Sequence, residues 1–461
     1  MSSGAHPVSH RVHWLHRRFP WLLIGLVVAA GVVLGIVVGI DRAFYSGQSR
    51  QSWPQSWPPR LCAVQGIDAR CGTFTVPENR AKPNGRTIGL RVLVLPASLK
   101  PVRKDAVTYL AGGPGDAATE QAVDQGWQSS ALRLHRDILL VDQRGTGGSN
   151  PHGGDVTQYG TRMAMDDLDA VRAALGYRQL DVIGSSYGAT AAQVYLKLHP
   201  SSVRTLILMG GTSIDVPFFD HYAVNAQRAL DQLAKLCAPD PGCRKAFPGW
   251  ERRFGELVKA WNAHPVNGMT GNELASTVHA MLLDLQKAVS IPLVISRAAT
   301  GDYKPLDQAG PGGLDADLNL MGSSIWCNEP WTGIDATGPW GTQFDSYTTA
   351  WIAALRKSCS SVTKRAEPRS LWTLPTTSSV PVLAFAGGAD PQDPAGNLGD
   401  LQQHFPDSRI VTFPHLGHEW GGIGSCFDQV VTDFVDRGTT KGLDTTRCTG
   451  AVVVSPFPLT D

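Results

Sequence analysis

The ten residues from Leu180 to Ala189 constrain the fold of this chain more than any other stretch. They read as a short apolar strand, a tight turn with the pattern Gly-x-Ser-x-Gly at 184–188, and the start of a helix. The two glycines let the backbone turn without a Cβ clash, so Ser186 is predicted to stand exposed above a sheet. The N-terminal N–H groups of the following helix favour negative charge at the same point. The pattern predicts a nucleophilic serine, against the alternative of a glycine-rich turn around a serine with no role.

Strands and helices alternate on both sides of this turn. Segments typical of strands occur at 71–77, 87–95, 106–110, 137–141, 203–209, 380–385 and 408–413, and segments with helical spacing at 163–175 and 189–199. This alternation predicts an α/β fold with a mostly parallel central sheet covered on both faces. Active sites in such sheets lie at the C-terminal ends of strands, where we expect the loops 111–115, 142–149 and 184–188 to meet.

The segment 214–375 differs from the rest of the chain because helical spacing dominates it. Helices are expected at 221–236, 244–262, 272–289 and 343–358, with proline and glycine breaks between them. Their spaced apolar residues favour helices packed on one another over a repeat or a coiled coil. We therefore expect a helical lid inserted between the two parts of the α/β core, 61–213 and 376–461.

The N-terminal region contains an uncharged, apolar stretch at 20–40. Its 21 residues are long enough to cross a hydrocarbon core of roughly 30 Å. Arginines precede it within 1–19, which predicts a cytoplasmic N-terminus and an exported remainder. The alternative is a cleaved signal peptide, whose apolar region is usually about 7–15 residues long and ends in small residues. Residues 41–60, rich in Ser, Gln, Pro and Trp, read as an extended linker.

The eight cysteines agree with export. None lies in Cys-x-x-Cys spacing, which argues against a metal site, and paired cysteines are typical of exported proteins. Couples close in sequence suggest disulfides, although other connectivities, and free thiols in a cytosolic protein, remain open alternatives. The suggested pairs are Cys62–Cys71, Cys237–Cys243, Cys327–Cys359 and Cys426–Cys448.

A serine nucleophile needs a base to take its proton and an acid to orient that base. The strand at 380–385 leads to Asp390, and the strand at 408–413 leads to His418, so both fall just past strand ends. We predict Ser186 as nucleophile, Asp390 as orienting acid and His418 as general base. Asp393 competes with Asp390, which directly follows two glycines and an alanine at its strand end. His415 competes with His418, which Gly417 precedes.

The attack of a serine on a carbonyl creates an oxyanion that needs two backbone N–H donors. One is predicted at Tyr187, the residue after the nucleophile. The other is predicted at Gly113 in the loop Gly112-Gly-Pro-Gly115, where missing side chains let a substrate approach the backbone, although an ordinary turn is the alternative.

Composition excludes several other functions. The formal net charge of +1 gives no electrostatic case for nucleic-acid binding. The chain has no phosphate-binding P-loop, no dinucleotide-binding glycine pattern and no His-Glu-x-x-His zinc helix. We expect no metal and no organic cofactor.

These residues together resemble the α/β-hydrolase-fold serine aminopeptidases of the prolyl and tripeptidyl type, in particular the exported actinobacterial TAP-like members. The resemblance covers roughly 60–450. Its matching stretches are Cys71-Gly-Thr-Phe-Thr-Val-Pro77, Gly112-Gly-Pro-Gly115, Val141-Asp-Gln-Arg-Gly-Thr-Gly147, Asp167-Leu-Asp-Ala-Val-Arg172, Leu175-Gly176, Gly184-Ser-Ser-Tyr-Gly188, Ile325-Trp-Cys-Asn-Glu329, Ala389-Asp-Pro391, Gly417-His418, Cys426 and Cys448.

The resemblance implies an enzyme that releases a residue or a short peptide from a free N-terminus through an acyl-enzyme. It also implies that acidic groups of the lid hold the substrate's α-ammonium group, and Glu329 fits that position, although a surface carboxylate is an equal alternative. The chain departs from the family at Asp116, Asp393 and Glu419, which puts the substrate range in doubt. Two rival functions stay open: an exported esterase or lipase with the same triad, and an inactive hydrolase fold that serves as an extracellular binding module.

Overall fold

The computed structural model describes residues 57–460, apart from 65, 123–124, 311–317, 421–423 and 449. These residues belong to one compact unit, 54–461. The predicted membrane anchor at 20–40 and all but the end of the predicted linker at 41–60 lie outside the described residues. Within the described part, no helix combines the length and the apolar character needed to cross a bilayer.

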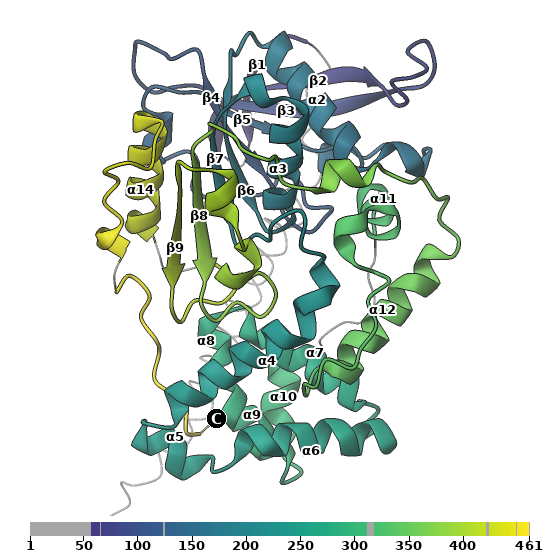
Figure 1. Cartoon of the computed structure of the whole chain (residues 1–461), viewed down its shortest axis with the longest axis vertical. Helices are drawn as coiled ribbons and strands as arrows, with labels where there is room; N and C mark the ends of the chain where they lie inside the picture. The colour runs from purple at the N-terminus through teal and green to yellow at the C-terminus, as the bar shows by residue number, and fades with distance from the viewer. Residues whose placement is uncertain are drawn as a thin grey trace, which may run out of the picture. The chain divides into compact units, whose positions relative to one another are not determined.

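Nine strands in the described part of the chain form one sheet (Figure 1), in the order β1-β2-β3-β5-β4-β6-β7-β8-β9. The first three strands and the β3–β5 pair are antiparallel, and every other neighbouring pair is parallel, as predicted. The strands are β1 Arg60–Val64, β2 Ile67–Pro77, β3 Thr87–Leu95, β4 Ala106–Leu110, β5 Ile138–Val141, β6 Leu180–Ser185, β7 Val203–Met209, β8 Val382–Gly387 and β9 Ser408–Phe413.

Helices cover both faces of the sheet, which explains why its central strands are apolar along their whole length. All five residues of β4 and all six of β8 are buried. Figure 1 shows α14 on one side of the strands and α2 with α3 on the other. The helices of the α/β core are α2 Thr161–Ala174, α3 Tyr187–Leu198, α13 Leu401–His404 and α14 Gly424–Arg437.

The predicted helical insertion lies between β7 and β8. Most of its helices share a second hydrophobic core, while Met321 and Ile325 of its second half pack into the core of the sheet. Its helices are α4 Phe218–Cys237, α5 Pro241–Ala246, α6 Trp250–Ala263, α7 Gly271–Leu282, α8 Leu285–Ala288, α9 Ile291–Ala298, α10 Lys304–Ala309, α11 Leu320–Asn328 and α12 Asp345–Cys359.

Two predicted helices of the insertion are each broken in two. The segment 244–262 divides into α5 and α6, because Pro248 and Gly249 separate them and Gly249 adopts a left-handed conformation with φ 66°. The segment 272–289 divides at Asp284, whose side chain accepts the backbone N–H of Gln286 and begins α8.

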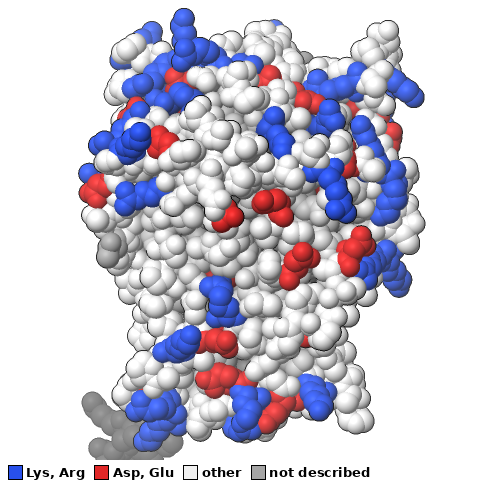
Figure 2. Space-filling model, in the orientation of Figure 1, with Lys and Arg blue, Asp and Glu red and all other residues white. Residues whose placement is uncertain are grey.

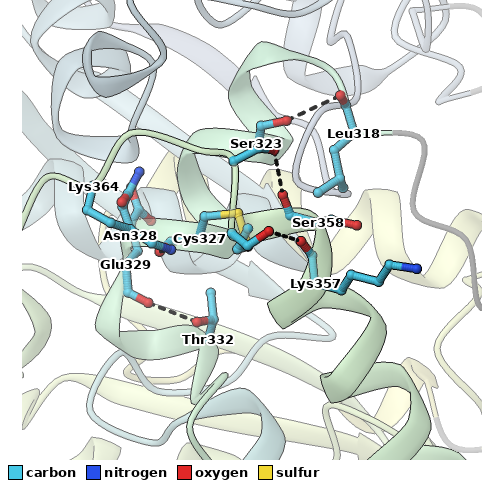
Figure 3. The surroundings of a disulfide bond; sticks show 12 residues. Leu318, Ser323, Cys327, Asn328, Glu329, Thr332, Lys357, Ser358 and Lys364 are labelled. Atoms are coloured by element: carbon cyan, nitrogen blue, oxygen red, sulfur yellow. Dashed lines mark hydrogen bonds between the residues drawn. A yellow bond between two sulfur atoms is a disulfide. The ribbon is translucent and has the colours of Figure 1, made fainter.

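The structure forms the four disulfides suggested by the sequence: Cys62–Cys71, Cys237–Cys243, Cys327–Cys359 and Cys426–Cys448. Cys327–Cys359 joins the ends of α11 and α12, and Figure 3 shows Glu329 and Lys364 beside it. Lys364 donates a hydrogen bond to the carbonyl oxygen of Cys327. The second half of the insertion is therefore held together covalently next to the residue predicted to bind a substrate amine.

Charged side chains of both signs share the surface. On the face drawn in Figure 2, acidic residues lie among the basic ones over both the sheet region and the helical insertion, with a largely uncharged area between. This distribution agrees with the net charge of +1 and offers no purely basic surface on that face.

Candidate active site

Ser186 lies in the turn between β6 and α3. Its backbone has φ 55° and ψ −126°, a conformation that residues with a side chain rarely adopt. The flanking glycines are required by close packing. A Cβ atom at Gly188 would lie 2.0 Å from the carbonyl oxygen of Leu110, and one at Gly184 would lie 2.2 Å from the carbonyl oxygen of Gly188. The turn therefore holds Ser186 at the C-terminal edge of the sheet.

Asp390 and His418 follow β8 and β9 and meet at that same edge. Nδ1 of His418 lies 2.8 Å from Oδ2 of Asp390, whose side chain is fully buried. The other carboxylate oxygen of Asp390 accepts the backbone N–H groups of Gln392 and Asp393, both at 2.9 Å. The acid is thus fixed from two sides and sets the orientation of the imidazole ring.

Ser186 and His418 line one cavity with a volume of about 460 Å³. Since Asp390 binds Nδ1 of His418, Nε2 is the ring nitrogen left for a proton from the serine. Among the described residues that line the cavity, His418 is the one histidine, so His415 does not take this place. The other lining residues are Tyr109, Gly112, Gly113, Asp116, Gln121, Gln125, Ser185, Met209, Gln392, Glu419 and Trp420.

The electrostatics of the pair favour a protonated imidazole. Burial lowers the pKa of His418, but the carboxylates of Asp390, Asp393 and Glu419 outweigh burial and raise it to about 9. Burial opposes ionisation of Asp390, but His418 and two backbone N–H groups bring the pKa of Asp390 below its ordinary value. The site is therefore built to stabilise the imidazolium that forms when His418 accepts a proton.

Both predicted oxyanion donors belong to segments that adjoin Ser186. Tyr187 is the first residue of α3, so its backbone N–H belongs to the positive end of that helix. Gly113 lines the cavity with a positive φ of 101°, and its neighbour Gly112 packs against Ser186. Asn319 supports this loop, because its side chain donates to the carbonyl oxygen of Gly115 at 2.8 Å.

The helical insertion holds the loops that carry the acid and the base. The backbone N–H groups of His418 and Glu419 both donate to the carbonyl oxygen of Leu283, between α7 and α8, at 2.8 Å. From α4, the guanidinium group of Arg228 donates to the carbonyl oxygens of Gly388 and Asp390, at 2.5 and 2.8 Å. The insertion therefore contributes to the placement of both triad partners.

Two family models match the chain. Residues 106–265 match the model described as alpha/beta hydrolase fold, and residues 343–448 match the model described as TAP-like protein. The chain therefore has the α/β-hydrolase fold. The first match contains the serine turn, and the second contains the positions of the acid and the base.

Individual relatives of this α/β hydrolase include peptidases. The chain is 24% identical to the tripeptidyl aminopeptidase of Streptomyces coelicolor over 82% of each chain. It is 31% identical to the proline iminopeptidase of Aeromonas sobria over 40% of this chain and 47% of that protein. The chain spans only about half the length of several curated relatives that it matches. The solved proline iminopeptidase of Mycobacterium smegmatis matches 79% of this chain and 98% of its own, with 17% identity and a TM-score of 0.44.

Glu329 of this α/β hydrolase is buried, and it is not among the described residues that line the cavity. Its carboxylate accepts three hydrogen bonds, from the backbone and the hydroxyl group of Thr161 at 2.6 and 2.7 Å and from the indole of Trp331 at 2.9 Å. Burial, which outweighs these bonds, raises the pKa of Glu329 to about 7. The amine-binding role stays a prediction that these contacts do not support, because the protein's own donors occupy both oxygens.

The side chains that surround the reacting serine are the part of the site that the sequence reasoning identified least well. Asp116 and Glu419 are exposed carboxylates on the cavity wall, and Gln121 and Gln392 add amide groups to it. The sequence analysis named Asp116 and Glu419 as departures from the family, next to predicted site segments, but it did not single out Gln121 or Gln392. Among the described residues, no three His, Cys, Asp or Glu side chains are grouped so that they could hold a metal.

Proposed function

We propose that this α/β hydrolase is a serine peptidase that releases single residues or short peptides from free N-termini through an acyl-enzyme. The observation that carries the proposal is the meeting of Ser186 with the hydrogen-bonded pair of His418 and Asp390 on one cavity. The peptidase names of the relatives support the reaction class.

In the proposed reaction, the hydroxyl oxygen of Ser186 attacks the scissile carbonyl carbon and its proton passes to Nε2 of His418. The backbone N–H groups of Gly113 and Tyr187 bind the oxyanion of the tetrahedral intermediate. The carbon–nitrogen bond then breaks, and His418 gives its proton to the leaving amine. A water molecule attacks the acyl-enzyme, His418 accepts its proton, and the proton returns to Ser186 as the peptide acid leaves.

The charge of the cavity favours a substrate with an ammonium group. Two carboxylates, Asp116 and Glu419, line it, and no lysine or arginine does among the described residues. Gln121 accepts the hydroxyl proton of Tyr109 and donates to Asp116, which orients that carboxylate within the cavity. A negatively charged cavity attracts a free N-terminus and disfavours an anionic ester or a fatty acid.

A comparison of three substrates tests this proposal. We expect the protein to hydrolyse an aminoacyl or tripeptidyl anilide with a free N-terminus faster than the N-acetylated anilide, and Ser186→Ala to abolish both reactions. If a p-nitrophenyl ester is the substrate of choice and blocking the N-terminus of the anilide changes nothing, the protein is an esterase. If a fluorophosphonate probe does not label Ser186, the protein is a binding module.

Charge-neutral variants test the amine-binding part separately. Asp116→Asn and Glu419→Gln are expected to raise KM for the free-N-terminus anilide by about three- to tenfold and to leave KM for the p-nitrophenyl ester unchanged. Glu120→Gln is the matched control, because Glu120 is an exposed carboxylate close in sequence that does not line the cavity. Equal effects on the anilide and the ester would assign these carboxylates to folding and not to substrate selection.

We also propose that the stretch at 20–40 anchors the catalytic part outside the cytoplasm. Its length and lack of charge support a span, and four disulfides suit an oxidising compartment. Membrane fractionation combined with protease treatment of intact cells tests this proposal. Recovery of the full-length protein in the cytoplasmic fraction would overturn it, and a soluble exported form would indicate a cleaved signal peptide.

A further inference from the structure

A second carboxylate stands beside the base. Asp393 is buried, and its Oδ2 lies 3.8 Å from Nδ1 of His418, about 1 Å farther than the oxygen of Asp390. The backbone N–H of Asp393 donates to Asp390 at 2.9 Å, so the two acids are held in one turn. One short turn therefore places two carboxylates near the same ring nitrogen, Asp390 within hydrogen-bond distance and Asp393 at 3.8 Å.

The second carboxylate is held in place by a directed chain of hydrogen bonds. The side-chain amide of Asn397 donates to the hydroxyl oxygen of Thr212 at 2.9 Å, and that hydroxyl group donates to Oδ1 of Asp393 at 2.5 Å. Asn397 is fixed in turn, because its amide also donates to the carbonyl oxygen of Gln392 and its oxygen accepts Asn225. This chain binds Oδ1 of Asp393, and the other oxygen of that carboxylate is the one nearer to His418.

Other titratable groups also act on His418. Glu419, on the same loop, adds negative charge and faces the cavity. From α7, His279 is fully buried, and burial lowers its pKa to about 3, so it stays uncharged near neutral pH. It hydrogen-bonds to Tyr222 of α4, whose hydroxyl pKa burial raises well above its ordinary value. Arg228, also on α4, is the nearby cation, and it binds carbonyl oxygens of the acid's loop.

On the basis of the proposed acyl-enzyme function, we propose that Asp393 is a second positioning carboxylate of the base, sharing the charge of the His418 imidazolium with Asp390. When His418 accepts the proton of Ser186, the ring gains a positive charge in a buried site, and both carboxylates stabilise it. When Asp390 is replaced, Asp393 is the nearby carboxylate that can accept the hydrogen bond from the Nδ1–H group of His418.

The rate at which a fluorophosphonate probe labels Ser186 tests this inference without assuming any natural substrate. That reaction needs the base but no particular peptide, and His418 must be neutral to accept the serine proton. The labelling rate of the wild-type protein therefore rises as pH increases through the pKa of His418. Burial, together with the charge of Asp390, raises the pKa of Asp393 to about 7, so Asp393 is ionised across this rise, which lies near the His418 pKa of about 9. Asp393→Asn removes that negative charge, so it is expected to move the midpoint of the rise down by about one pH unit.

A double-variant cycle tests the sharing of the base. Asp390→Asn is expected to keep a residual labelling rate, and Asp390→Asn combined with Asp393→Asn is expected to lose about another tenfold or more, down to the rate of His418→Gln. Glu120→Gln is the control: Glu120 is an exposed carboxylate that does not line the cavity, so adding this change to Asp390→Asn leaves the residual rate unchanged.

A uniform loss of rate in Asp393→Asn, with an unchanged midpoint, would overturn the inference, as would a double variant no slower than Asp390→Asn alone. If the asparagine variant does not fold, Asp393→Ser removes the same charge with a smaller side chain, and thermal melting confirms that it is folded. Failure of the proposed function is separate: in that case the probe labels Ser186 with the expected pH shifts, but the protein cleaves no peptide anilide.

Discussion

Arg144 and Asp167 form a bidentate ion pair between the loop after β5 and helix α2. Nε and Nη2 of Arg144 lie 2.6 and 2.8 Å from the two carboxylate oxygens of Asp167. The remaining Nη1 donates to the carbonyl oxygens of Glu78 and Gln158 at 2.7 and 2.8 Å. The pair is buried, so one guanidinium group joins the end of β2, the loop and α2.

Removing this arginine is expected to destabilise the fold severely. Arg144→Met leaves two carbonyl oxygens without a donor and a buried carboxylate that keeps only Arg80, which costs about 3–5 kcal/mol of the free energy of unfolding. Urea unfolding measures the loss. Arg252→Met is the matched control, because its pair with Glu256 is exposed and is expected to contribute about 1 kcal/mol or less. Similar losses in the two variants would contradict the prediction.

The strained backbone of Ser186 predicts that this position lowers stability in order to place the nucleophile. Its φ of 55° with ψ of −126° is strained for any residue with a Cβ atom and not for glycine. Ser186→Gly and Ser186→Ala both remove the nucleophile, and we expect the glycine variant to be the more stable by about 1 kcal/mol. Thermal melting of the two inactive variants checks this, and an alanine variant as stable as the glycine variant would contradict it.

The buried carboxyl group of Glu329 predicts how stability depends on pH. Its pKa is raised from 4.5 to about 7 in the folded protein, so the unfolded chain ionises first as pH increases. The stability that this group contributes is therefore complete below pH 4.5 and is lost between pH 4.5 and 7, by up to about 3 kcal/mol. Glu329→Gln removes the titration. We expect the free energy of unfolding of the variant to fall less across this window, measured by denaturant unfolding at several pH values. Parallel curves would show that Glu329 does not titrate there.

The two disulfides of the helical insertion are expected to differ in their contribution to stability. Cys327 and Cys359 are 32 residues apart, and Cys237 and Cys243 are 6 apart. Closing the longer loop restricts the unfolded chain more, so replacing the first pair by serine costs roughly 4 kcal/mol and replacing the second roughly 2 kcal/mol. Thermal unfolding of the two double-serine variants measures the difference, and a larger loss for the short loop would contradict the expectation.

The contact between the insertion and the loop that carries His418 predicts that a substitution outside the triad lowers activity. A Cβ atom at Gly417 would lie 2.4 and 2.6 Å from the carbonyl oxygens of Leu283 and Leu282. Gly417→Ala must therefore push His418 away from α7 and α8, and we expect kcat to fall by about tenfold or more while the fold is kept. Gly396→Ala is the control, because nothing lies near a Cβ atom there. Unchanged kcat in Gly417→Ala would show that the contact is dispensable.

The sequence was sufficient to predict the sheet and the approach of the acid to the base, because both depend on local patterns. The strands at 106–110 and 203–209 coincide with β4 and β7, and the residues after β8 and β9 bring Asp390 and His418 together. The serine turn was predictable because glycine on both sides of a serine satisfies a steric requirement that few other sequences meet.

The surroundings of Glu329 could not be predicted in the same way. Its partner Thr161 begins α2, far away in the chain, and only the packing of α11 against the α/β core brings the two together. The amphipathic spacing of the insertion gave its helices but not their breaks, because the break at Asp284 depends on a single side-chain hydrogen bond. The shared position of Asp393 and Asp390 also depends on the tertiary contact of Thr212.

The carbonyl oxygen of Leu283 accepts the N–H groups of both His418 and Glu419, so one atom of the insertion ties the catalytic ring to the helices above it. A rearrangement that displaces Leu283 while keeping these two bonds would move the imidazole relative to the carboxylate of Asp390 and reduce activity. A ligand that binds between α7 and α8 and displaces Leu283 would therefore inhibit the protein without contacting Ser186.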